Sequence, residues 1–378
     1  MKIAIVRKEC GFFKGGAERY CMNLCAEMAS MGHEVYVLSN KFDDSSCGGI
    51  KHVRVHVKNR SSSTKNLSFH ENCQRILSEI RPDWSYALSR TYPVDAFRVS
   101  DPLHAQWMKV RYPGKLRRLL EQANPRHRVI LSLEKNILNP ENTRIIITNS
   151  KLVKSQVVNT YNYPASRIYV VYNGVELERF SPGEGRVREE LRLDGSETVL
   201  LFVSMDFKRK GLDYLLDAIA ILKSRGVGLK LVVVGKDGKK TYQKKVRKLG
   251  IGNSVFFVGE VSNVEDYYRS ADIFVLPTRY DPFANVCLEA MACGTPVITT
   301  VNNGASELIT ESVDGYVIDE PRRIVEKLVE KLYHFVLLPA SEKGKMRRQA
   351  RLKAEKYSIE QNASQTLAVF EKELGLSK

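Results

Sequence analysis

Two carboxylates, Asp281 and Glu289, lie eight positions apart in the second half of the chain. Short apolar runs before Asp281 and from Pro296 onward predict two buried parallel strands. Residues 285–293 between these runs predict a short crossover helix, because Gly294 and Pro296 end it. In a strand–loop–helix–strand unit of this kind, Asp281 and the start of the helix lie at the carboxyl edge of the sheet, where α/β proteins bind ligands.

The start of this helix, at Asn285 and Val286, is the predicted anion site. Backbone N–H groups and the positive end of the helix dipole favour negative charge there, close to Phe283 and Ala284. Carboxylates beside an anion site can accept hydrogen bonds from hydroxyl groups. The combination predicts a phosphorylated, polyhydroxylated ligand such as a nucleotide sugar. A surface carboxylate without a binding role is the alternative interpretation of Glu289.

Three consecutive cations, Lys208, Arg209 and Lys210, stand in a loop between a predicted strand and a predicted helix. Their charges repel one another unless an anion lies among them. A solvated basic loop is the alternative, but a position at the carboxyl end of a strand favours an anion site.

The paired glycines Gly15 and Gly16 join the first predicted strand to the first predicted helix. Glycines let a phosphate approach the backbone closely, and the start of a helix adds its dipole. A flexible surface turn is the alternative. The pattern is not GxGxxG, which argues against an NAD-type site.

Three further polar or turn positions follow predicted strands: Asp101 and His104 in the first half, and Val261 in the second. An Asx turn followed by a surface histidine explains Asp101 and His104 as well as a functional role does. A plain strand-to-helix turn explains Val261 equally well.

Strands and helices alternate along both halves of the chain, which indicates parallel sheets with helices on both faces. The predicted strands cover residues 3–6, 34–39, 53–57, 84–89, 97–100, 144–148, 198–203, 229–234, 254–258, 273–276, 297–300 and 316–318. The clearest predicted helices cover residues 17–31, 70–80, 212–225 and 242–249. The predicted fold class is therefore α/β, with two doubly wound parallel-sheet (Rossmann-like) domains.

The domain boundary is predicted near the turn at residues 171–176, because the Pro/Gly-rich stretch 180–185 follows it. The first domain then comprises residues 1–172 and the second comprises residues 173–356, with the ligand expected in the cleft between the domains. The last segment, residues 358–374, predicts an amphipathic helix that no strand follows.

The chain of 378 residues carries a net charge of +16, and this charge is uneven. Residues 1–172 hold 27 Lys and Arg against 14 Asp and Glu, a balance of +13, which leaves +3 for the rest. A basic domain implies an acidic partner, such as an anionic membrane, a phosphorylated acceptor or nucleic acid.

Membrane spans, targeting segments and cysteine chemistry are not indicated. No apolar run approaches the roughly 20 residues of a membrane span, and the first residues predict a strand rather than a signal peptide. The seven cysteines lack metal-binding spacing, so we expect no metal site, no disulfide and a cytosolic protein.

Two basic, amphipathic segments, residues 109–121 and 126–134, combine Lys and Arg with aromatic and aliphatic residues. Such a mixture suits an anionic membrane surface, where each cation can contribute about 1 kcal/mol. A solvated helix that packs on its own domain is the alternative. Nucleic acid is disfavoured as a partner, because we find no RNA-binding signature and no aromatic stacking platform in the sequence.

The pattern from Asp281 to Glu289, together with Arg209-Lys210 and the Gly15-Gly16 loop, resembles a known family. It is similar to that of the retaining glycosyltransferases of the GT-B class, family 4, in particular the bacterial lipopolysaccharide-core glucosyltransferases. The resemblance extends over nearly the whole chain and is strongest between residues 200 and 318. It implies that the C-terminal helix, residues 357–378, packs on the first, acceptor-binding domain, and that the second domain binds the donor.

For the donor, the resemblance implies that the glycine loop and the Arg209-Lys210 pair contact the diphosphate. Glu289 binds the ribose hydroxyls, Asp281 lies by the transferred sugar, and backbone groups near Val261 hold the base. Many family members carry the arginine five residues before the lysine, where this chain has Met205, whereas the core-glucosyltransferase branch has the adjacent pair.

For the acceptor, the resemblance implies that Asp101 orients or deprotonates the reacting hydroxyl, with His104 as the substitute candidate. The sequence departs from the family pattern at three positions: Asp281 replaces the usual Glu, and Pro282 and Ala284 replace Gly. These changes bear on the identity of the sugar and leave the binding of a nucleotide as expected.

These expectations combine into one function. The expected function is the transfer of a hexose, glucose in the first instance, with retention from a UDP-sugar to a sugar of an anionic, lipid-linked saccharide such as the lipopolysaccharide core. The UDP-sugar is a co-substrate, no metal or other cofactor is required, and the protein is expected in the cytoplasm, peripheral on the inner face of the cytoplasmic membrane.

Two other function classes compete with this interpretation. A nucleotide-sugar epimerase of the GT-B fold is one, and a non-catalytic basic protein that binds lipid or RNA is the other. The basic first domain argues against the epimerase, because free UDP-sugars need no membrane docking.

Overall fold

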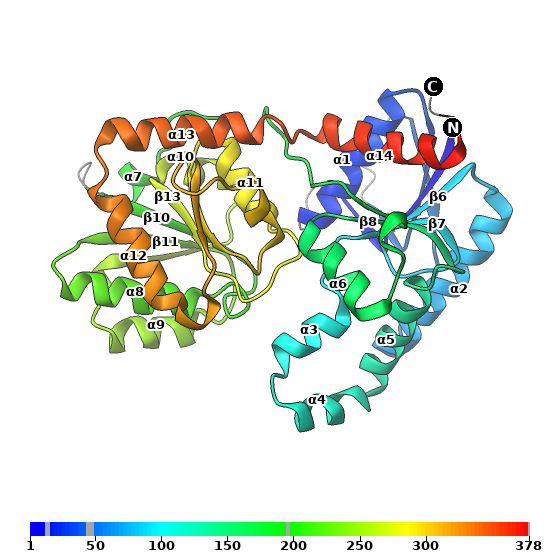
Figure 1. The fold of residues 1–378 in the computed structure, drawn as a ribbon, viewed down its shortest axis with the longest axis horizontal. Helices are drawn as coiled ribbons and strands as arrows, with labels where there is room; N and C mark the ends of the chain where they lie inside the picture. Colours follow the sequence, from blue (N-terminus) through cyan, green and yellow to red (C-terminus); the bar gives the residue numbers. More distant parts are fainter. Residues whose placement is uncertain (12–15, 43–48, 194–196, 377–378) are drawn as a thin grey trace. The chain divides into compact units, whose positions relative to one another are not determined.

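The computed structural model describes residues 1–11, 16–42, 49–193 and 197–376. The chain divides into two compact units, Met1–Gly174 with Ile359–Lys378, and Val175–Ser358. The predicted boundaries, after residues 172 and 356, each lie two residues earlier than the boundaries between these units. Each unit is built on a parallel sheet flanked by helices (Figure 1), which confirms the predicted α/β class with two doubly wound, Rossmann-like domains.

The first unit contains a seven-stranded sheet in the order β5-β3-β1-β6-β7-β8-β9, and all of its neighbouring strands pair in parallel. Its strands are β1 (Lys2–Val6), β3 (Glu34–Ser39), β5 (Ile50–Arg54), β6 (Trp84–Ala87), β7 (Val94–Val99), β8 (Thr143–Thr148) and β9 (Ile168–Val170). A separate two-stranded pair consists of β2 (Glu9–Cys10) and β4 (Lys41–Phe42). The helices of this unit are α1 (Gly16–Ser30), α2 (Ser62–Ile80), α3 (His104–Arg111), α4 (Lys115–Gln122), α5 (Pro125–Ile137), α6 (Lys151–Tyr161), the 3-10 turn η1 (Ala165–Arg167) and α14 (Ile359–Leu374).

The edge strand β5 lies three residues earlier than the strand predicted at residues 53–57. Its pairing with β3 defines it, although most of its side chains are not buried. The apolar alternation that suggested the later position continues past the end of the strand. There Val55 is fully buried and its N–H donates to the carbonyl of Ser39 at 2.7 Å. At this edge of the sheet, the buried apolar residue therefore lies in the loop after the strand and not in the strand itself.

The C-terminal helix α14 packs on the first unit, against α1 and one face of the sheet (Figure 1). Phe370 is fully buried, and its ring lies 5.0 Å from that of Trp84 and 5.2 Å from that of Tyr86. Asn362 of α14 accepts a hydrogen bond from the hydroxyl of Tyr20 in α1 at 2.5 Å. The apolar side of this last helix therefore covers one face of a sheet whose strands lie in the first half of the chain.

The second unit contains a six-stranded parallel sheet in the order β12-β11-β10-β13-β14-β15. Its strands are β10 (Thr198–Val203), β11 (Leu229–Val234), β12 (Val255–Gly259), β13 (Ile273–Leu276), β14 (Val297–Thr300) and β15 (Gly315–Ile318). Its helices are α7 (Val187–Glu190), α8 (Leu212–Ser224), α9 (Lys239–Lys248), α10 (Val264–Ser270), α11 (Asn285–Ala292), α12 (Ile324–Leu337) and α13 (Ala340–Ala354), with the 3-10 turns η2 (Gly252–Ser254), η3 (Gly304–Leu308) and η4 (Pro321–Arg323). The central neighbours β10, β13 and β14 bring the loops that follow them to one edge.

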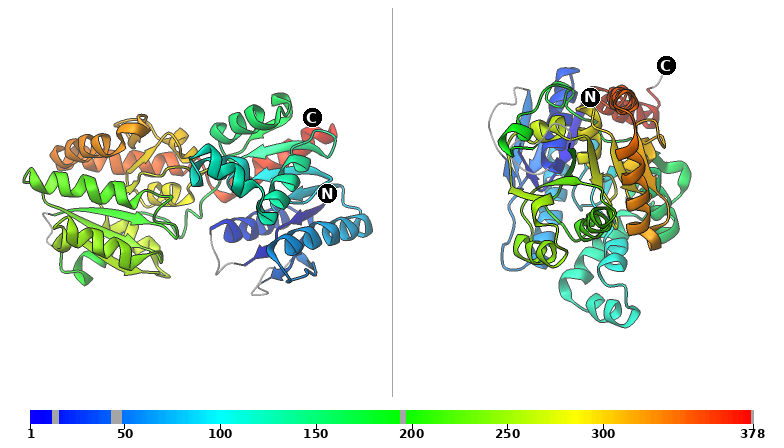
Figure 2. Two further views of the ribbon diagram at one scale, coloured as in Figure 1. Left: turned by 90° about the horizontal axis from the view of Figure 1, so that it is seen from below. Right: turned by 90° about the vertical axis from the view of Figure 1, so that its left-hand side faces the viewer.

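Helices α3 and α4 of the first unit extend away from its sheet, as the cyan segment of Figures 1 and 2 shows. Unlike the longer helices of the unit, α4 buries none of its eight residues. No helix in the described part of the chain has the length and apolar character that a bilayer crossing requires.

Candidate functional site

The loop between β10 and α8 holds the cations that the sequence singled out. It ends at Gly211, which has a positive φ of +80°. A Cβ atom at Gly211 would lie 2.1 Å from the carbonyl oxygen of Pro277, so only glycine lets the loop pass the end of β13 this closely. The carbonyl of Arg209 accepts hydrogen bonds from the Arg279 N–H at 2.8 Å and from the Thr278 hydroxyl at 3.1 Å. The loop is thereby fastened to the segment that leads to Asp281.

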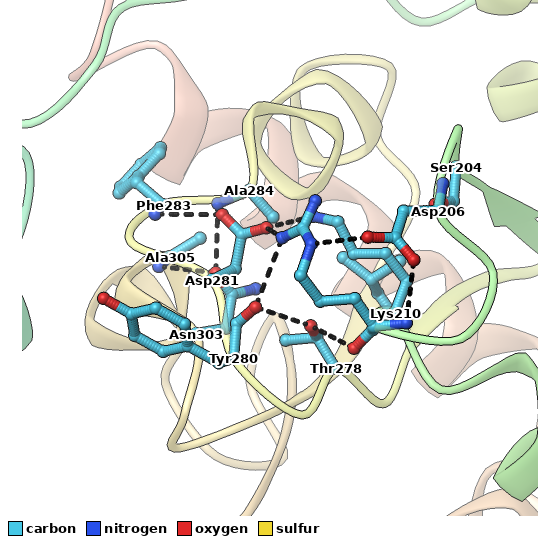
Figure 3. A network of polar contacts seen from close by, with 12 residues as sticks. Ser204, Asp206, Lys210, Thr278, Tyr280, Asp281, Phe283, Ala284, Asn303 and Ala305 are labelled. Atoms are coloured by element: carbon cyan, nitrogen blue, oxygen red, sulfur yellow. Dashed lines mark hydrogen bonds and ion pairs between the residues drawn. The ribbon is translucent and has the colours of Figure 1, made fainter. Parts of the chain in front are cut away.

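Arg209, Lys210 and Asp281 form one cluster of charges (Figure 3). Oδ2 of Asp281 accepts hydrogen bonds from the Lys210 ammonium and, at 2.7 Å, from Nη1 of Arg209. Nε of Arg209 also donates to Asp206 at 3.0 Å. Asp281 is 6% exposed and Lys210 is 8% exposed. The structure therefore brings Asp281 together with the predicted pair Arg209 and Lys210, which stands about 70 positions earlier in the chain.

The charge state of Asp281 follows from two opposing effects. Burial alone would raise the pKa of its carboxyl, but the adjacent charges of Lys210 and Arg209 outweigh burial and lower the pKa. Asp281 is therefore ionised at neutral pH and compensates both cations. The described contacts use one of the three donors of Lys210 and three of the five donors of Arg209. Both cations thus keep donors that a second anion can use.

The first turn of α11 lies beside this cluster. The helix begins at Asn285, as predicted, and its N-cap residue Ala284 makes no side-chain cap hydrogen bond within the described residues. The Phe283 N–H donates to Oδ1 of Asp281 at 3.1 Å, and the Ala284 N–H donates to Oδ1 of Asn303 at 3.0 Å. These two bonds hold the residues that directly precede the helix, so the positive end of the helix, at Asn285 and Val286, begins two residues after a direct contact with Asp281.

Asn303 is a residue that the sequence analysis missed. It is fully buried, and its amide also accepts from the Ala305 N–H at 3.1 Å and donates to the Thr299 hydroxyl at 3.0 Å. Asn303 follows β14 at the same sheet edge as Asp281, and the two residues form a parallel bridge. The available signal in the sequence was a polar residue soon after a predicted strand. Such residues are too common to single out Asn303 unless the order of strands in the sheet is known.

Glu289 lies in the second turn of α11, in a different environment from Asp281. Its half-buried carboxylate accepts a hydrogen bond from the hydroxyl of Tyr268 in α10 at 3.0 Å. Burial raises the pKa of Glu289 to about 7, and the hydrogen bond from Tyr268 and the charge of Arg179 offset only part of that effect. Val261 lies in the turn between β12 and α10, the helix that carries Tyr268. The two carboxylates of the motif are thus one ionised, cation-bound group and one desolvated group.

In the first unit, Gly15 lies outside the described residues, and Gly16 is the first residue of α1. Asp101 follows β7; its side chain is 51% exposed, and Oδ2 lies 3.7 Å from Nη1 of Arg7. The same unit contains a cavity of about 450 Å³ that Asp101 helps to line.

His104 opens α3 and points into the interior of the first unit. It is 8% exposed, and its Nε2 lies 2.9 Å from Nδ1 of His127. Burial, together with the charges of Arg90, His127 and Arg126, lowers the pKa of His104 to about 4, so the ring is neutral at pH 7. A neutral, internally bonded ring is a poorer partner for an acceptor hydroxyl than the exposed carboxylate of Asp101.

The described residues contain no group of three or more His, Cys, Asp or Glu side chains arranged to hold a metal ion. The six cysteines within those residues are buried, and none of them forms a disulfide.

Two family models match the chain on either side of the boundary between its units. Residues 14–179 match the family described as Glycosyltransferase Family 4, and residues 184–357 match the family described as Glycosyl transferases group 1. Together these matches span nearly the whole chain. The chain therefore belongs to the glycosyltransferases, with a family 4 domain followed by a group 1 domain.

Among curated relatives, the lipopolysaccharide glucosyltransferase WaaG of Escherichia coli strain K12 is 26% identical over 314 residues, which are 81% of this chain and 82% of WaaG. The chain spans less than half the length of several other curated relatives that it matches. The crystal structure of WaaG superposes with a TM-score of 0.82 at 23% identity and covers 97% of this chain and 99% of WaaG. Anabaena HepE in complex with UDP-glucose superposes with a TM-score of 0.69 at 18% identity, over 98% of this chain and all of HepE. The fold is accordingly GT-B.

The raised pKa of Glu289 predicts a pH-dependent stability that the variant Glu289→Gln lacks. The unfolded carboxyl loses its proton near its ordinary value of 4.5 and the folded one near 7. The stability that the protonated form contributes is therefore fully present below pH 4.5 and is lost as the pH rises through about 7. Glutamine does not titrate and keeps its contribution at every pH. We therefore expect the free energy of unfolding of Glu289→Gln, relative to that of the unmodified protein, to rise by ~1–3 kcal/mol as the pH goes from 4.5 to 8.

Urea unfolding at pH 5 and pH 8 measures this difference. Glu342→Gln, which removes an exposed carboxylate from α13, is the matched control and should show the same difference at both values. A Glu289→Gln effect that does not change with pH would mean that the carboxyl is ionised throughout.

Proposed function

We propose that the protein is a retaining glycosyltransferase that moves a hexose, glucose in the first instance, from a UDP-sugar to a sugar of a lipid-linked saccharide such as the lipopolysaccharide core. The observation that carries the proposal is the cluster of the partly buried Arg209 with the buried Lys210 and Asp281, beside the start of α11. Family membership, the similarity to the lipopolysaccharide glucosyltransferase WaaG and the UDP-glucose complex of HepE support these substrate classes.

In this proposal the donor diphosphate binds to the free donors of Arg209 and Lys210 and to the start of α11. Glu289 accepts hydrogen bonds from the ribose hydroxyls, since a desolvated carboxylate that carries no cation suits neutral hydroxyl donors better than phosphate. Asp281 holds the two cations in place before the donor arrives and lies next to the transferred sugar once it is bound. Backbone groups near Val261 hold the base.

Catalysis is electrostatic in the proposed mechanism. As the bond from the anomeric carbon to the phosphate oxygen breaks, negative charge grows on the departing UDP, and Arg209, Lys210 and the helix dipole stabilise it. The acceptor oxygen bonds to the same face of the anomeric carbon, and its proton passes to the departing phosphate. Because two fixed cations supply the positive charge, we propose a metal-independent reaction. Asp101, in the first unit, orients the acceptor hydroxyl.

The proposed acceptor is lipid-linked, and α4 supports a peripheral contact with an anionic membrane. Its leucines Leu116, Leu119 and Leu120 are 74%, 65% and 67% exposed, although apolar side chains of this size are normally covered. Basic residues alternate with them along the helix. An exposed helix of leucine and arginine matches the chemistry of a bilayer interface, so we propose a cytoplasmic protein that docks on the inner face of the cytoplasmic membrane.

A thermal-shift panel of UDP, GDP, ADP and dTDP in the presence of EDTA tests the donor site. We expect the largest rise in Tm with UDP, because a ligand that binds only the folded state stabilises it by RT ln(1 + [L]/Kd), about 2.7 kcal/mol at a hundredfold excess over Kd. Preference for GDP or ADP would contradict a UDP-sugar donor. No response to any nucleotide would contradict the donor site as a whole.

The variant Lys210→Ala tests the clamp. Turnover should fall by roughly 10²–10³, the effect of removing one preorganised charged donor at a developing negative charge. Asp281 keeps Arg209 as its partner, so the fold should persist, and a measured Tm confirms this. The control is Lys208→Ala, an exposed cation of the same loop, which should leave turnover within a few-fold of the unmodified protein. Equal turnover in both variants would refute the assignment.

The variant Leu119→Gln/Leu120→Gln tests the docking helix. It should lose binding to anionic phosphatidylglycerol vesicles at low salt. It should keep its thermal shift with UDP, because none of the residues of α4 is buried in the fold. Leu337→Gln removes a leucine on α12 in the other unit that is 64% exposed, and serves as the control. Unchanged sedimentation of the α4 variant with vesicles would remove membrane contact from the proposal.

A further inference from the structure

The cavity of about 450 Å³ in the first unit lies at the carboxyl edge of its sheet, where β1, β6 and β7 end. Helices α2 and α5 complete its walls. Six basic side chains line it, against four acidic ones. The basic residues are Arg7, Lys8, Lys65, Arg90, Arg98 and Arg126, and the acidic residues are Glu9, Glu18, Asp101 and Glu134.

Two of the basic residues are engaged in contacts within the fold, Arg7 mainly with carboxylates and Arg98 with neutral oxygen atoms. Arg7 is bonded to Glu18 at 3.0 Å, lies 3.7 Å from Asp101 and donates to the carbonyl of Leu88 at 3.1 Å. Arg98 is fully buried and donates to the carbonyl of Val171 at 2.9 Å and to Asn173 at 2.8 Å. These two guanidinium groups bond to the surrounding protein, so they have fewer donors left for a ligand than the remaining cations.

One acidic residue is likewise occupied by the fold. The Glu134 carboxylate accepts hydrogen bonds from the N–H groups of His104 and Ala105 at the start of α3, at 2.5 and 3.1 Å, and from the Tyr161 hydroxyl. The nearest nitrogen of Arg90 is 3.9 Å away from this carboxylate, too far for a hydrogen bond. Glu134 is thus engaged mainly with backbone and compensates Arg90 weakly.

Among the described residues, Lys8 and Lys65 have no ion pair, and Arg90 has only the 3.9 Å contact with Glu134. Arg126, the sixth basic residue, is exposed on α5, so Lys8, Lys65 and Arg90 are the cations that converge within the cavity. The Lys8 ammonium donates to the side chain of Asn66 at 2.8 Å, a neutral partner. Burial and the charges of Lys65 and Arg90 lower the pKa of Lys8 to about 8, although Glu9 acts in the opposite direction. The Glu9 carboxylate also lies 3.5 Å from Lys41. Like charges converge here, and an anion placed among them would relieve the repulsion.

A polar group on the same wall also lacks a partner. The hydroxyl of Ser100, between Val99 and Asp101, is buried and has no hydrogen-bond partner among the described residues. Buried polar atoms in folded proteins are nearly always satisfied, so an unsatisfied one in a cavity wall indicates a position that a ligand or water completes. A ligand with several oxygen atoms would satisfy both this hydroxyl and the cations.

We propose that this cavity binds an anionic substituent of the acceptor, a phosphate ester or a carboxylate, between Lys8, Lys65 and Arg90, so that the acceptor is an acidic saccharide. The inference rests on the proposed glycosyltransferase function and specifies its acceptor class. The cavity volume falls within the roughly 300–1,000 Å³ of ligand pockets, enough for a monosaccharide unit. Asp101 lines the same cavity, so the reacting hydroxyl and the anionic group would belong to one bound acceptor.

Binding of three matched probes, glucose 6-phosphate, glucuronate and glucose, tests the proposal by NMR titration at constant ionic strength. We expect at least one of the two acidic sugars to bind roughly tenfold or more tightly than glucose, because charge-assisted hydrogen bonds are the stronger ones. Inorganic phosphate, titrated alone and as a competitor, distinguishes recognition of a phosphate group from recognition of a carboxylate. Equal affinity for all three sugars, or no binding of any, would overturn the proposal.

The double variant Lys65→Gln/Arg90→Gln should lose that tenfold preference while its thermal shift with UDP stays unchanged. Lys58→Gln/Arg60→Gln makes the same change of charge at two exposed positions of the first unit outside the cavity lining, and should keep the preference. Loss of preference in both variants would assign the effect to general charge and overturn the site. A protein that shifts with UDP but does not distinguish the sugars refutes only this inference, whereas one that fails to shift with UDP refutes the donor site first.

Discussion

The arrangement of the second unit depends on the compensation of Arg209 and Lys210 by Asp281. Taking two cations out of water is costly unless a carboxylate accompanies them with good hydrogen-bond geometry. That requirement brings the loop after β10 against the loop after β13, and Gly211 leaves the space for the approach. Asn303, which lies after β14, accepts a hydrogen bond from Ala284 and so holds the loop after β13 where α11 begins. Together these residues hold positive charge at one edge of the sheet.

The two carboxylates of the same motif differ because their environments differ. Asp281 has cations within hydrogen-bond distance, and its pKa is lowered, whereas burial beside Tyr268 raises the pKa of Glu289 to about 7. Pairs of titratable groups whose environments move their pKa values apart are characteristic of functional sites, since each group is suited to a different partner. One carboxylate organises charge for the diphosphate in the proposed function, and the other is free to meet hydroxyl groups.

The same principle recurs in the first unit with a different balance. Its sheet edge also collects cations. Arg7 is paired with Glu18 and Arg98 is hydrogen-bonded to a backbone carbonyl, while Lys8, Lys65 and Arg90 converge with little compensation. The excess of positive charge in residues 1–172 is therefore not only a diffuse surface property. Part of it lines a cavity next to Asp101, and part of it stands on α4 among exposed leucines, which gives the basic domain two separate roles in the proposed function.

The sequence alone was sufficient for the α/β class, the division into two parallel-sheet domains, the start of α11 and the family, because these follow from local apolar periodicity, helix-ending residues and motif spacing. It could not predict the placement of β5, whose pairing and not its apolar pattern defines it, or the role of Asn303. Only the tertiary structure decided that Asp281 joins Arg209 and Lys210 while Glu289 stands apart, and which basic residues of the first unit remain uncompensated. Charge compensation and burial depend on distances between segments far apart in the chain, and the order of strands in a sheet sets those distances.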